Sequence, residues 1–319
     1  MSMNNFQVNL DYELASGLTI RGKWKRKPYK LIRKLGAGVT GVVYLAEGPE
    51  GKVALKVGVE HMSITSEVNV LKQFGKVQGK ALGPCLFDVD DYVSHSATLP
   101  FYTMEYIQGE NFVSFMRDRG NEWLGVLMLQ LTANLHVLHK EGWIFGDLKP
   151  DNLIVTDSPA RVRLLDVGGT TRVGRAIKEY TEYYDRGYWE LGTRKAAPSY
   201  DIFAAAMIMI DCAYPKQANK RSGQTEAQLK KLVYDASMLK PYRAALLKAI
   251  QGKYVSAEAF RNDLLLTTMQ NQPDVPVKPR GKKAKRKTVK KKSSYAIEWM
   301  LLFSFVLLVT VLYLFGRTF

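Results

Sequence analysis

The stretch that decides the fold reads Ile144-Phe145-Gly146-Asp147-Leu148-Lys149-Pro150-Asp151-Asn152. A helical stripe of leucines precedes it and stops at Gly142, and a β-favouring run follows at 153–155. A second strand-like run at 162–165 ends in Asp166-Val167-Gly168. Two carboxylates and an amide on adjacent loops suit phosphoryl transfer, because one Asp orients the attacking hydroxyl while an Asp and an Asn hold a metal on the nucleotide. The stretch therefore predicts a phosphoryl-transfer site.

A glycine-rich turn lies earlier in the chain, at Gly36-Ala37-Gly38-Val39-Thr40-Gly41. Glycines let the backbone approach phosphates without Cβ clashes and present N–H donors to them. Dinucleotide-binding folds use the same spacing, but there the last glycine opens a helix. Here the β-favouring residues 42–44 continue into a strand. We therefore expect a β-hairpin that covers the phosphates of a nucleotide.

The strand-like run at 52–57 carries Lys56, which we expect to hold the α- and β-phosphates. Taken alone, such a lysine often only protects the edge of a sheet. The next segment, 63–71, has a helix-starting composition and offers Glu67 as the acid that orients Lys56. Glu60 is the alternative, but it follows the strand too soon for a helix to have formed. We expect a Lys56–Glu67 ion pair.

The order and spacing of these motifs resemble those of a Hanks-type, eukaryotic-like Ser/Thr protein kinase, over residues 29–266. The resemblance implies an α+β, bilobal protein-kinase-like fold, with a small β-rich N-lobe at 29–107 and a larger helical C-lobe at 108–270. It also implies ATP with Mg²⁺ or Mn²⁺ as cofactors and cytoplasmic proteins as substrates. The resemblance assigns Asp147 and Lys149 to catalysis, Asn152 and Asp166 to the metal, and to the nucleotide Gly36, Ala37, Gly38, Gly41, Val43, Ala54, Lys56, Glu67, Met104, Glu105 and Ile107.

Several positions depart from the family pattern. Gly146 stands where the family has the arginine of His-Arg-Asp, so activation through a phosphate paired with that arginine is not expected. The usual Asp-Phe-Gly is Asp166-Val167-Gly168, which keeps the metal ligand. Glu190 matches the glutamate of the Ala-Pro-Glu motif, and Asp201 matches the buried aspartate that braces the catalytic loop. The candidate phosphosites are Thr170, Thr171 and Thr181.

Two other functions fit part of the sequence. Small-molecule phosphotransferases of the wider kinase-like group also favour Gly-Asp at the catalytic position, but Lys149-Pro150-Asp151-Asn152 favours a Ser/Thr protein kinase. A pseudokinase scaffold is the alternative without enzyme activity. All residues expected to touch metal or phosphate are present, however, and a pseudokinase without catalytic activity need not retain them. We expect an active enzyme.

The C-terminal end has a different composition from the rest. Residues 299–316 carry no charge and are rich in Leu, Val and Phe, and at 1.5 Å per residue they span about 27 Å, close to the thickness of a bilayer's hydrocarbon core. We expect one transmembrane helix at 295–316 and a three-residue extracytoplasmic tail at 317–319. A buried core helix is the alternative, although such helices seldom run this long without a charge.

The net charge of +16 is concentrated before this apolar segment, because 278–292 contains ten basic residues and no acidic one. By the positive-inside rule the kinase domain would lie in the cytoplasm, anchored to the cell membrane by a single pass with the C-terminus outside. We expect residues 1–28 to be an N-terminal extension of the kinase domain. We expect the Pro-containing stretch 271–294 to be a linker and juxtamembrane segment. The two cysteines show no disulfide or metal-binding spacing.

The basic tract admits two kinds of partner. It is suited to anionic lipid headgroups, and it also suits the backbone of double-stranded DNA. Because no external domain is evident, we expect that gathering on a polyanion favours self-association and trans-autophosphorylation. The layout resembles that of sporulation-associated kinases of Bacillus relatives. The residues expected to contact a polyanion are Lys282, Lys283, Lys285, Arg286, Lys287, Lys290, Lys291 and Lys292.

Overall fold

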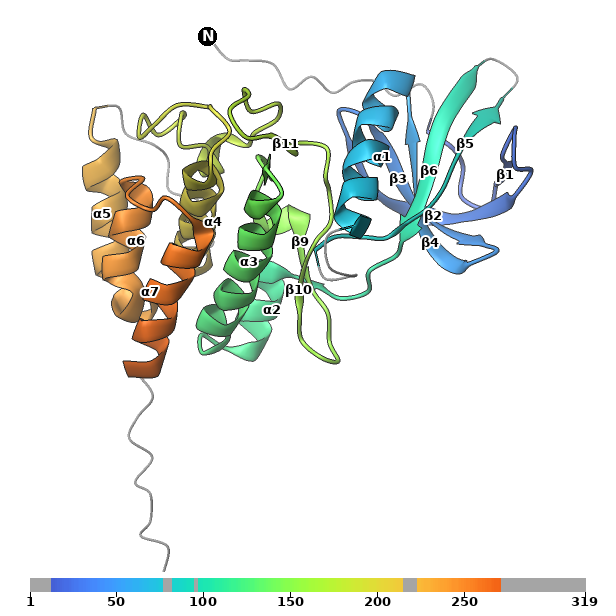
Figure 1. Ribbon diagram of the computed structural model, residues 1–319. Coiled ribbons are helices and arrows are strands. Elements are labelled where there is room, and N and C mark those ends of the chain that lie inside the picture. The colour runs from blue at the N-terminus through green and yellow to red at the C-terminus, as the bar shows by residue number, and fades with distance from the viewer. Residues whose placement is uncertain (1–12, 77–81, 95–96, 215–222, 271–319) are drawn as a thin grey trace, which may run out of the picture. The chain divides into compact units, whose positions relative to one another are not determined.

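The computed structural model describes residues 13–76, 82–94, 97–214 and 223–270. These residues belong to one compact unit, Met1–Gln272. Three hydrophobic clusters lie within the unit, so it holds its own core and can fold without the rest of the chain. The unit has two lobes, a strand-rich one and a helical one (Figure 1).

The N-lobe is a six-stranded antiparallel sheet in the order β1-β2-β3-β4-β6-β5. An isolated bridge between Gly22 and Tyr92 joins the chain just after β1 to β5. The strands are β1 (Thr19–Arg21), β2 (Pro28–Gly38), β3 (Gly41–Gly48), β4 (Gly51–Gly58), β5 (Leu86–Val93) and β6 (Thr98–Glu105). Strand β1 lies within residues 1–28, the expected N-terminal extension, and there it pairs with β2 and extends the sheet.

Alternation of buried and exposed residues explains how this sheet packs. Along β2, Tyr29 and Leu31 point into the core while Lys30 faces solvent. Helix α1 (His61–Lys76) packs against β5 and β6. Its first turn also lies close to β4, because a Cβ on Gly58 would come within 2.3 Å of the Ile64 side chain. This close approach places α1 directly beside the strand that carries Lys56.

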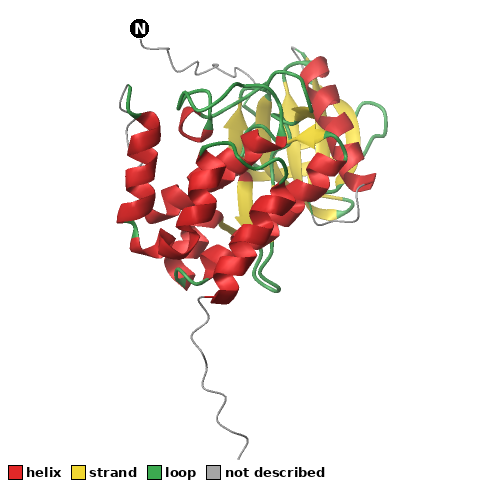
Figure 2. Ribbon diagram, turned by 60° about the vertical axis from the view of Figure 1, so that its left-hand side comes forward, coloured by secondary structure: helices red, strands yellow, loops and turns green. Residues whose placement is uncertain are grey.

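The C-lobe is built around α4 (Pro198–Ala213), whose residues 200–211 are all buried. The other helices of this lobe are α2 (Phe112–Arg119), α3 (Trp123–Lys140), α5 (Thr225–Asp235), α6 (Arg243–Ile250) and α7 (Ala257–Gln270), with 3-10 turns at Pro150–Asn152, Glu182–Tyr184 and Ser237–Tyr242. Helices α3, α6 and α7 pack against α4, and Figure 2 shows the helices of the molecule in red beside the yellow strands. The expected bilobal α+β architecture is confirmed.

Two small sheets hold the loops of the predicted site. One has the order β10-β9-β7 and the other pairs β11 with β8. Their strands are β7 (Glu110–Asn111), β8 (Trp143–Ile144), β9 (Leu153–Val155), β10 (Val162–Leu164) and β11 (Thr171–Arg172). The decisive stretch therefore forms a loop anchored by β8 at one end and β9 at the other.

Within the described residues, no helix combines the length and the apolar composition that a membrane crossing requires. The segment expected to cross, 295–316, lies outside the described residues. So does the basic tract 278–292.

Candidate active site

Asp147 lies at the centre of a set of short polar contacts. Lys149 donates from Nζ to Asp147 Oδ2 over 2.6 Å, and the Asn152 amide nitrogen lies 3.3 Å from the same oxygen. The hydroxyl of Thr181 donates to Asp147 Oδ1 over 3.0 Å and receives a hydrogen bond from Lys149 over 3.1 Å. The structure thus brings together three predicted residues, and it adds a direct contact from Thr181.

Asp201 fixes the backbone that carries Asp147. Its carboxylate is fully buried in the first turn of α4, where it accepts hydrogen bonds from the backbone N–H groups of Phe145 at 2.8 Å and Gly146 at 2.9 Å. His139 Nε2, at the end of α3, lies 2.8 Å from Asp201 Oδ2. The expected brace is present, and His139 is a further member that the sequence motifs did not indicate.

Lys56 and Glu67 form a buried ion pair. Lys56 Nζ lies 2.8 Å from one carboxylate oxygen of Glu67 and 2.7 Å from the other, and each residue is only 3% exposed. Tyr102 donates its hydroxyl hydrogen to Glu67 over 2.7 Å, and Thr40, in the glycine-rich turn, does so over 2.7 Å. Burial and the charge of Glu67 raise the pKa of Tyr102 well above its usual value. Glu60 lies just before α1, and its carbonyl accepts a hydrogen bond from Ile64 at the start of that helix.

The glycine-rich turn is the hairpin between β2 and β3, with Gly38 opposite Gly41. A Cβ on Gly41 would come within 2.2 Å of the Val57 carbonyl oxygen, whereas a Cβ on Gly36 or Gly38 would meet nothing within 4 Å. The backbone at Gly36 and Gly38 is therefore open on the side where a Cβ would stand. On the neighbouring strands, cross-strand partners are Val43 with Lys56 and Ala54 with Met104.

Asn152 and Asp166 have the donor atoms that a hard divalent cation prefers. The Asn152 amide nitrogen bonds to the Asp147 carbonyl at 2.8 Å, which leaves its side-chain oxygen for a cation. Asp166 Oδ1 accepts from the Gly168 N–H at 2.9 Å. The described residues contain no group of three or more His, Cys, Asp or Glu side chains arranged to hold a metal by themselves. Proteins commonly bind Mg²⁺ with one or two carboxylates plus phosphate oxygens, and Asn152 and Asp166 supply oxygen donors of this kind.

Glu179 adds a negative charge to this region that the sequence motifs did not indicate. Burial raises the pKa of the Glu179 carboxyl, and the charges of Asp166 and Asp147 raise it further while Lys56 opposes them. A cation bound at Asp166 would relieve this repulsion. The local electrostatics therefore fit a divalent metal.

Met104 and Glu105, which the resemblance assigns to the nucleotide, end strand β6, where the chain passes from the N-lobe to the C-lobe. The backbone N–H of Glu105 donates to the Cys85 carbonyl over 2.8 Å, and Ile107 is buried just beyond the strand. The Glu105 side chain forms an ion pair with Arg163 of β10 at 2.9 Å, and Arg163 also donates to the Gly83 carbonyl over 2.7 Å. Burial opposes ionisation of Glu105, but the hydrogen bond and charge of Arg163 outweigh it and lower the Glu105 pKa. This cross-lobe contact was not predicted.

The candidate phosphosites differ in their surroundings. Thr170 is 0% exposed and Thr171 is 2% exposed, so neither hydroxyl is accessible to another kinase in this conformation. The hydroxyl of Thr181 contacts Asp147 and Lys149. These positions favour structural roles in this conformation, and phosphorylation at any of them would require the segment to move.

Glu190, which was matched to the glutamate of the Ala-Pro-Glu motif, does not lie in the core. Glu190 is exposed, with φ of 59°, although its neighbour Trp189 is fully buried. The buried acid of this segment is Asp185, which accepts hydrogen bonds from Arg194 at 2.7 Å and from the Tyr200 hydroxyl at 2.8 Å. Asp185 therefore anchors the segment to α4.

Comparison with known proteins agrees with this architecture. The model of the protein kinase domain matches residues 29–265, so the chain belongs to the protein kinase family. The chain is similar to the serine/threonine-protein kinase YabT of Bacillus subtilis (strain 168), with 53% identity over 82% of this chain and 78% of that protein. It is a bacterial Hanks-type serine/threonine protein kinase that uses ATP and a divalent metal.

Two more distant similarities agree with this assignment. The serine/threonine-protein kinase PknD of Mycobacterium tuberculosis (strain ATCC 25618 / H37Rv) is 27% identical over 68% of this chain and 34% of its own length. The crystal structure of the Mycobacterium tuberculosis PknI kinase domain has a TM-score of 0.54 at 19% identity, covering 80% of this chain and 100% of that domain. At that identity, the second match supports the fold alone.

Proposed function

We propose that Asp147 is the catalytic base of a kinase that phosphorylates serine and threonine side chains. The observation that carries the proposal is the convergence of Lys149 and Thr181 on the Asp147 carboxylate. A carboxylate oriented in this way can accept the proton of an incoming hydroxyl at one of its oxygens. Lys149 offsets the negative charge that develops nearby, and Thr181 fixes the rotation of the carboxylate.

The remaining predicted residues would hold the nucleotide and its metal. Lys56, oriented by Glu67, would contact the α- and β-phosphates, while the backbone at Gly36, Ala37, Gly38 and Gly41 covers them. Val43, Ala54 and Met104 would surround adenine, with backbone groups of Glu105 and Ile107 facing it. Asn152 and Asp166 would bind the divalent metal, with Mg²⁺ favoured over Mn²⁺. When bound, the metal nucleotide supplies the γ-phosphoryl group and neutralises charge on it.

Replacing Thr181 with Val tests this arrangement. Valine has nearly the same shape as threonine but lacks the hydroxyl. Asp147 is therefore less well oriented in this variant, and kcat should fall by about 10- to 100-fold. The Michaelis constant for ATP should change little, because Thr181 makes no predicted contact with the nucleotide. The measurement is the initial rate of phosphate transfer from ATP to serine and threonine of a generic basic protein.

The conservative variant Thr181→Ser separates the loss of the hydroxyl from any other disturbance at this position. It retains the hydroxyl and should keep most of the activity. Wild-type rates in Thr181→Val would contradict the assignment, and so would equal losses in both variants.

We propose further that the kinase is attached to the cell membrane by residues 295–316, with the kinase domain in the cytoplasm and 317–319 outside. The support is in the sequence: an uncharged apolar stretch is preceded by ten basic residues and followed by one, Arg317. Residues 271–294 would link the C-lobe at 108–270 to the anchor.

The basic tract is proposed to bind double-stranded DNA and so to gather kinase molecules. Its ten cations within 278–292 support this proposal, because neutralising phosphates releases counterions and gives sequence-independent affinity. Molecules gathered on one polymer would phosphorylate each other more rapidly, since confinement raises their effective concentration. Thr170, Thr171 and Thr181 remain the candidate sites of this autophosphorylation.

A comparison of fragments 1–294 and 1–272 tests the role of the tract. DNA should stimulate autophosphorylation of the longer fragment only. Its DNA affinity should fall by about 10³-fold or more between low and moderate salt, as expected for six to ten phosphate contacts. Filter binding and labelled phosphate incorporation measure these effects. A longer fragment in which Ala replaces the eight Lys and Arg residues at 282–292 is the control. Equal DNA binding by 1–272 would contradict the assignment.

A further inference from the structure

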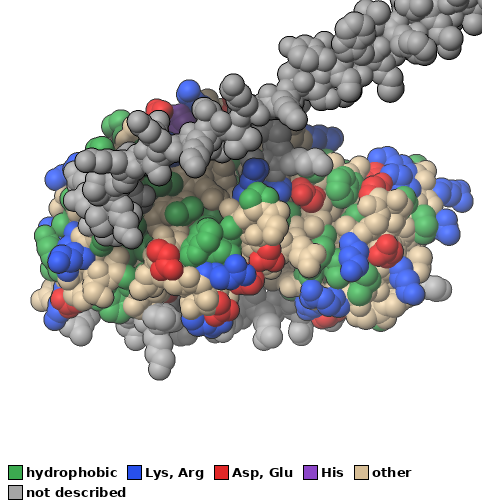
Figure 3. Space-filling model, turned by 90° about the horizontal axis from the view of Figure 1, so that it is seen from below, with side chains coloured by type: hydrophobic (Ala, Val, Ile, Leu, Met, Phe, Trp, Pro, Cys, Tyr) green, Lys and Arg blue, Asp and Glu red, His purple; other side chains and the backbone are tan. Residues whose placement is uncertain are grey.

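The turn between β1 and β2 carries an exposed concentration of cations, and we call residues 22–27 the N-lobe tip. From Arg21 to Lys34 the chain has eight basic residues and no acidic one. Seven of the eight are exposed, and Lys27 is half-buried. Lys and Arg side chains gather at the right-hand end of the molecule in Figure 3, where the N-lobe lies. This patch belongs to the folded domain and is separate from the tract at 278–292.

Acidic residues of β5 hold the backbone of the N-lobe tip in a fixed shape. Asp90 accepts hydrogen bonds from the backbone N–H groups of Trp24 at 2.9 Å and Lys25 at 2.8 Å. Asp91 accepts from the indole Nε1 of Trp24 at 3.0 Å. The contact at Gly22 is so close that a Cβ there would come within 2.2 Å of Asp90. The tip is therefore preorganised rather than loosely attached.

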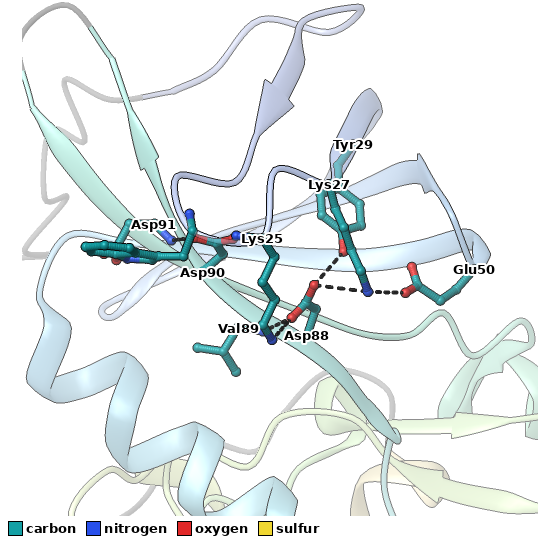
Figure 4. Close-up of polar contacts among 9 residues, drawn as sticks. Lys25, Lys27, Tyr29, Glu50, Asp88, Val89, Asp90 and Asp91 are labelled. Atoms are coloured by element: carbon teal, nitrogen blue, oxygen red, sulfur yellow. Dashed lines mark hydrogen bonds and ion pairs between the residues drawn. The ribbon is translucent and has the colours of Figure 1, made fainter.

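Asp88 forms ion pairs with two of the tip's lysines. Its side chain is 1% exposed and lies between Lys25 and Lys27, as Figure 4 shows; the Lys27 contact is 3.3 Å. Lys27 also pairs with Glu50 at 2.9 Å. Burial opposes ionisation of Asp88, but its hydrogen bonds, that from Lys25 foremost, lower its pKa. The carboxylates of Asp88 and Glu50 are therefore already paired with Lys25 and Lys27.

Other cations of the patch face solvent without such a partner. Among the residues that the structure describes, no carboxylate pairs with Arg21, Lys23, Arg26, Lys30 or Arg33. The Arg21 guanidinium donates to the Arg26 carbonyl over 3.0 Å, which places these two cations next to each other. Lys23 Nζ lies 4.6 Å from the centre of the Trp24 ring, and Trp24 is 68% exposed. The tip thus presents cations around an exposed aromatic ring.

We infer that the N-lobe tip is a contact site for the anionic surface of a lipid bilayer. Lys and Arg are attracted to anionic headgroups, and tryptophan favours the interface between headgroups and hydrocarbon. The indole N–H already bonds to Asp91, so the ring can enter this interface without losing a hydrogen bond. Double-stranded DNA would engage the cations but has no comparable environment for the ring. The exposed indole therefore favours lipid over nucleic acid.

Fragment 1–272 provides the direct test, because it folds as a unit and lacks the basic tract. Its cosedimentation is measured with phosphatidylcholine vesicles, alone or with one third phosphatidylglycerol. We expect binding to the anionic vesicles only. Each basic residue near the surface is worth about fivefold in affinity, so Lys23→Ala with Arg26→Ala should weaken binding about 25-fold. Trp24→Ala should weaken it by about fivefold or more.

Matched variants on the C-lobe control for net charge and exposed aromatic area. Lys231→Ala with Lys253→Ala removes two exposed cations, and Tyr234→Ala removes a 52% exposed ring that has Arg243 5.2 Å from its centre. These controls should bind as the wild type does, and all variants should keep their phosphotransfer rate in solution. Equal binding to neutral and anionic vesicles would overturn the inference, as would equal losses in tip and control variants. Binding to duplex DNA but not to vesicles would assign the tip to nucleic acid instead.

Discussion

Replacing Asp147 with Asn will lower kcat for phosphoryl transfer by about 10³-fold, within the range that general-base catalysis contributes. The amide has almost the shape of the carboxylate, and its oxygen can still accept the Thr181 hydrogen bond, but it cannot take the proton of an attacking hydroxyl. Lys149 also loses the charge it faces at 2.6 Å. Single-turnover transfer from labelled ATP to a basic protein measures the loss.

Two further measurements separate a lost proton acceptor from a damaged fold. Asp157→Asn makes the same chemical change at an exposed carboxylate 3.4 Å from Arg119 and should leave the rate unchanged. The Tm of both variants should stay close to that of the wild type, and ATP binding should persist in Asp147→Asn. If Asp147→Asn kept more than about a tenth of the wild-type kcat, another group would have to accept the proton.

Replacing Lys56 with Met will affect both stability and activity. Glu67 would remain 3% exposed without its cation, and breaking a buried pair in this way costs about 3–5 kcal/mol in the free energy of unfolding. The contact proposed for the α- and β-phosphates would also be lost, so kcat/KM for ATP should fall by about 10²-fold or more. Urea unfolding and initial rates measure the two effects.

The double variant Lys56→Met with Glu67→Gln separates these effects. A neutral amide at 67 can accept from one of the Thr40 and Tyr102 hydroxyls with its oxygen and donate to the other with its nitrogen, so most of the lost stability should return. Activity should not return, because no cation faces the phosphates. Recovery of activity in the double variant would show that the ion pair serves only to stabilise the fold.

The sequence was sufficient to predict the features that depend on local residue patterns. The leucine stripe at 124–138 predicted the helix that the structure has as α3, Trp123–Lys140. Spacing also distinguished Glu67 from Glu60, because a helix needs room to begin after a strand, and only Glu67 lies on α1 facing Lys56. Short-range periodicity determines which residues share a face of a helix or strand, so such predictions do not require knowledge of the tertiary structure.

The contacts that the sequence analysis missed join residues far apart in the chain. Thr181 and Asp147 are 34 residues apart, and Arg163 and Glu105 are 58 apart. No local sequence pattern indicates which side chains of two distant segments will contact each other. Asp185 was missed for a related reason, because the family motif is altered here and the buried Asp185 and Trp189 decide how this segment packs. Likewise, β1 is too short to show a period, and pairing with β2 makes it a strand.

The bridge between Gly22 and Tyr92 has a consequence for crowded conditions. The open borders of a sheet carry unpaired N–H and C=O groups, which can recruit a strand from another molecule and begin aggregation. Here the outer strands β1 and β5 are tied to each other at one corner, where the N–H of Lys23 also bonds to the Asp91 carbonyl at 2.7 Å. That corner offers little backbone for strand exchange. Aggregation by strand exchange should therefore not begin at that corner, even where many copies of the protein are held close together.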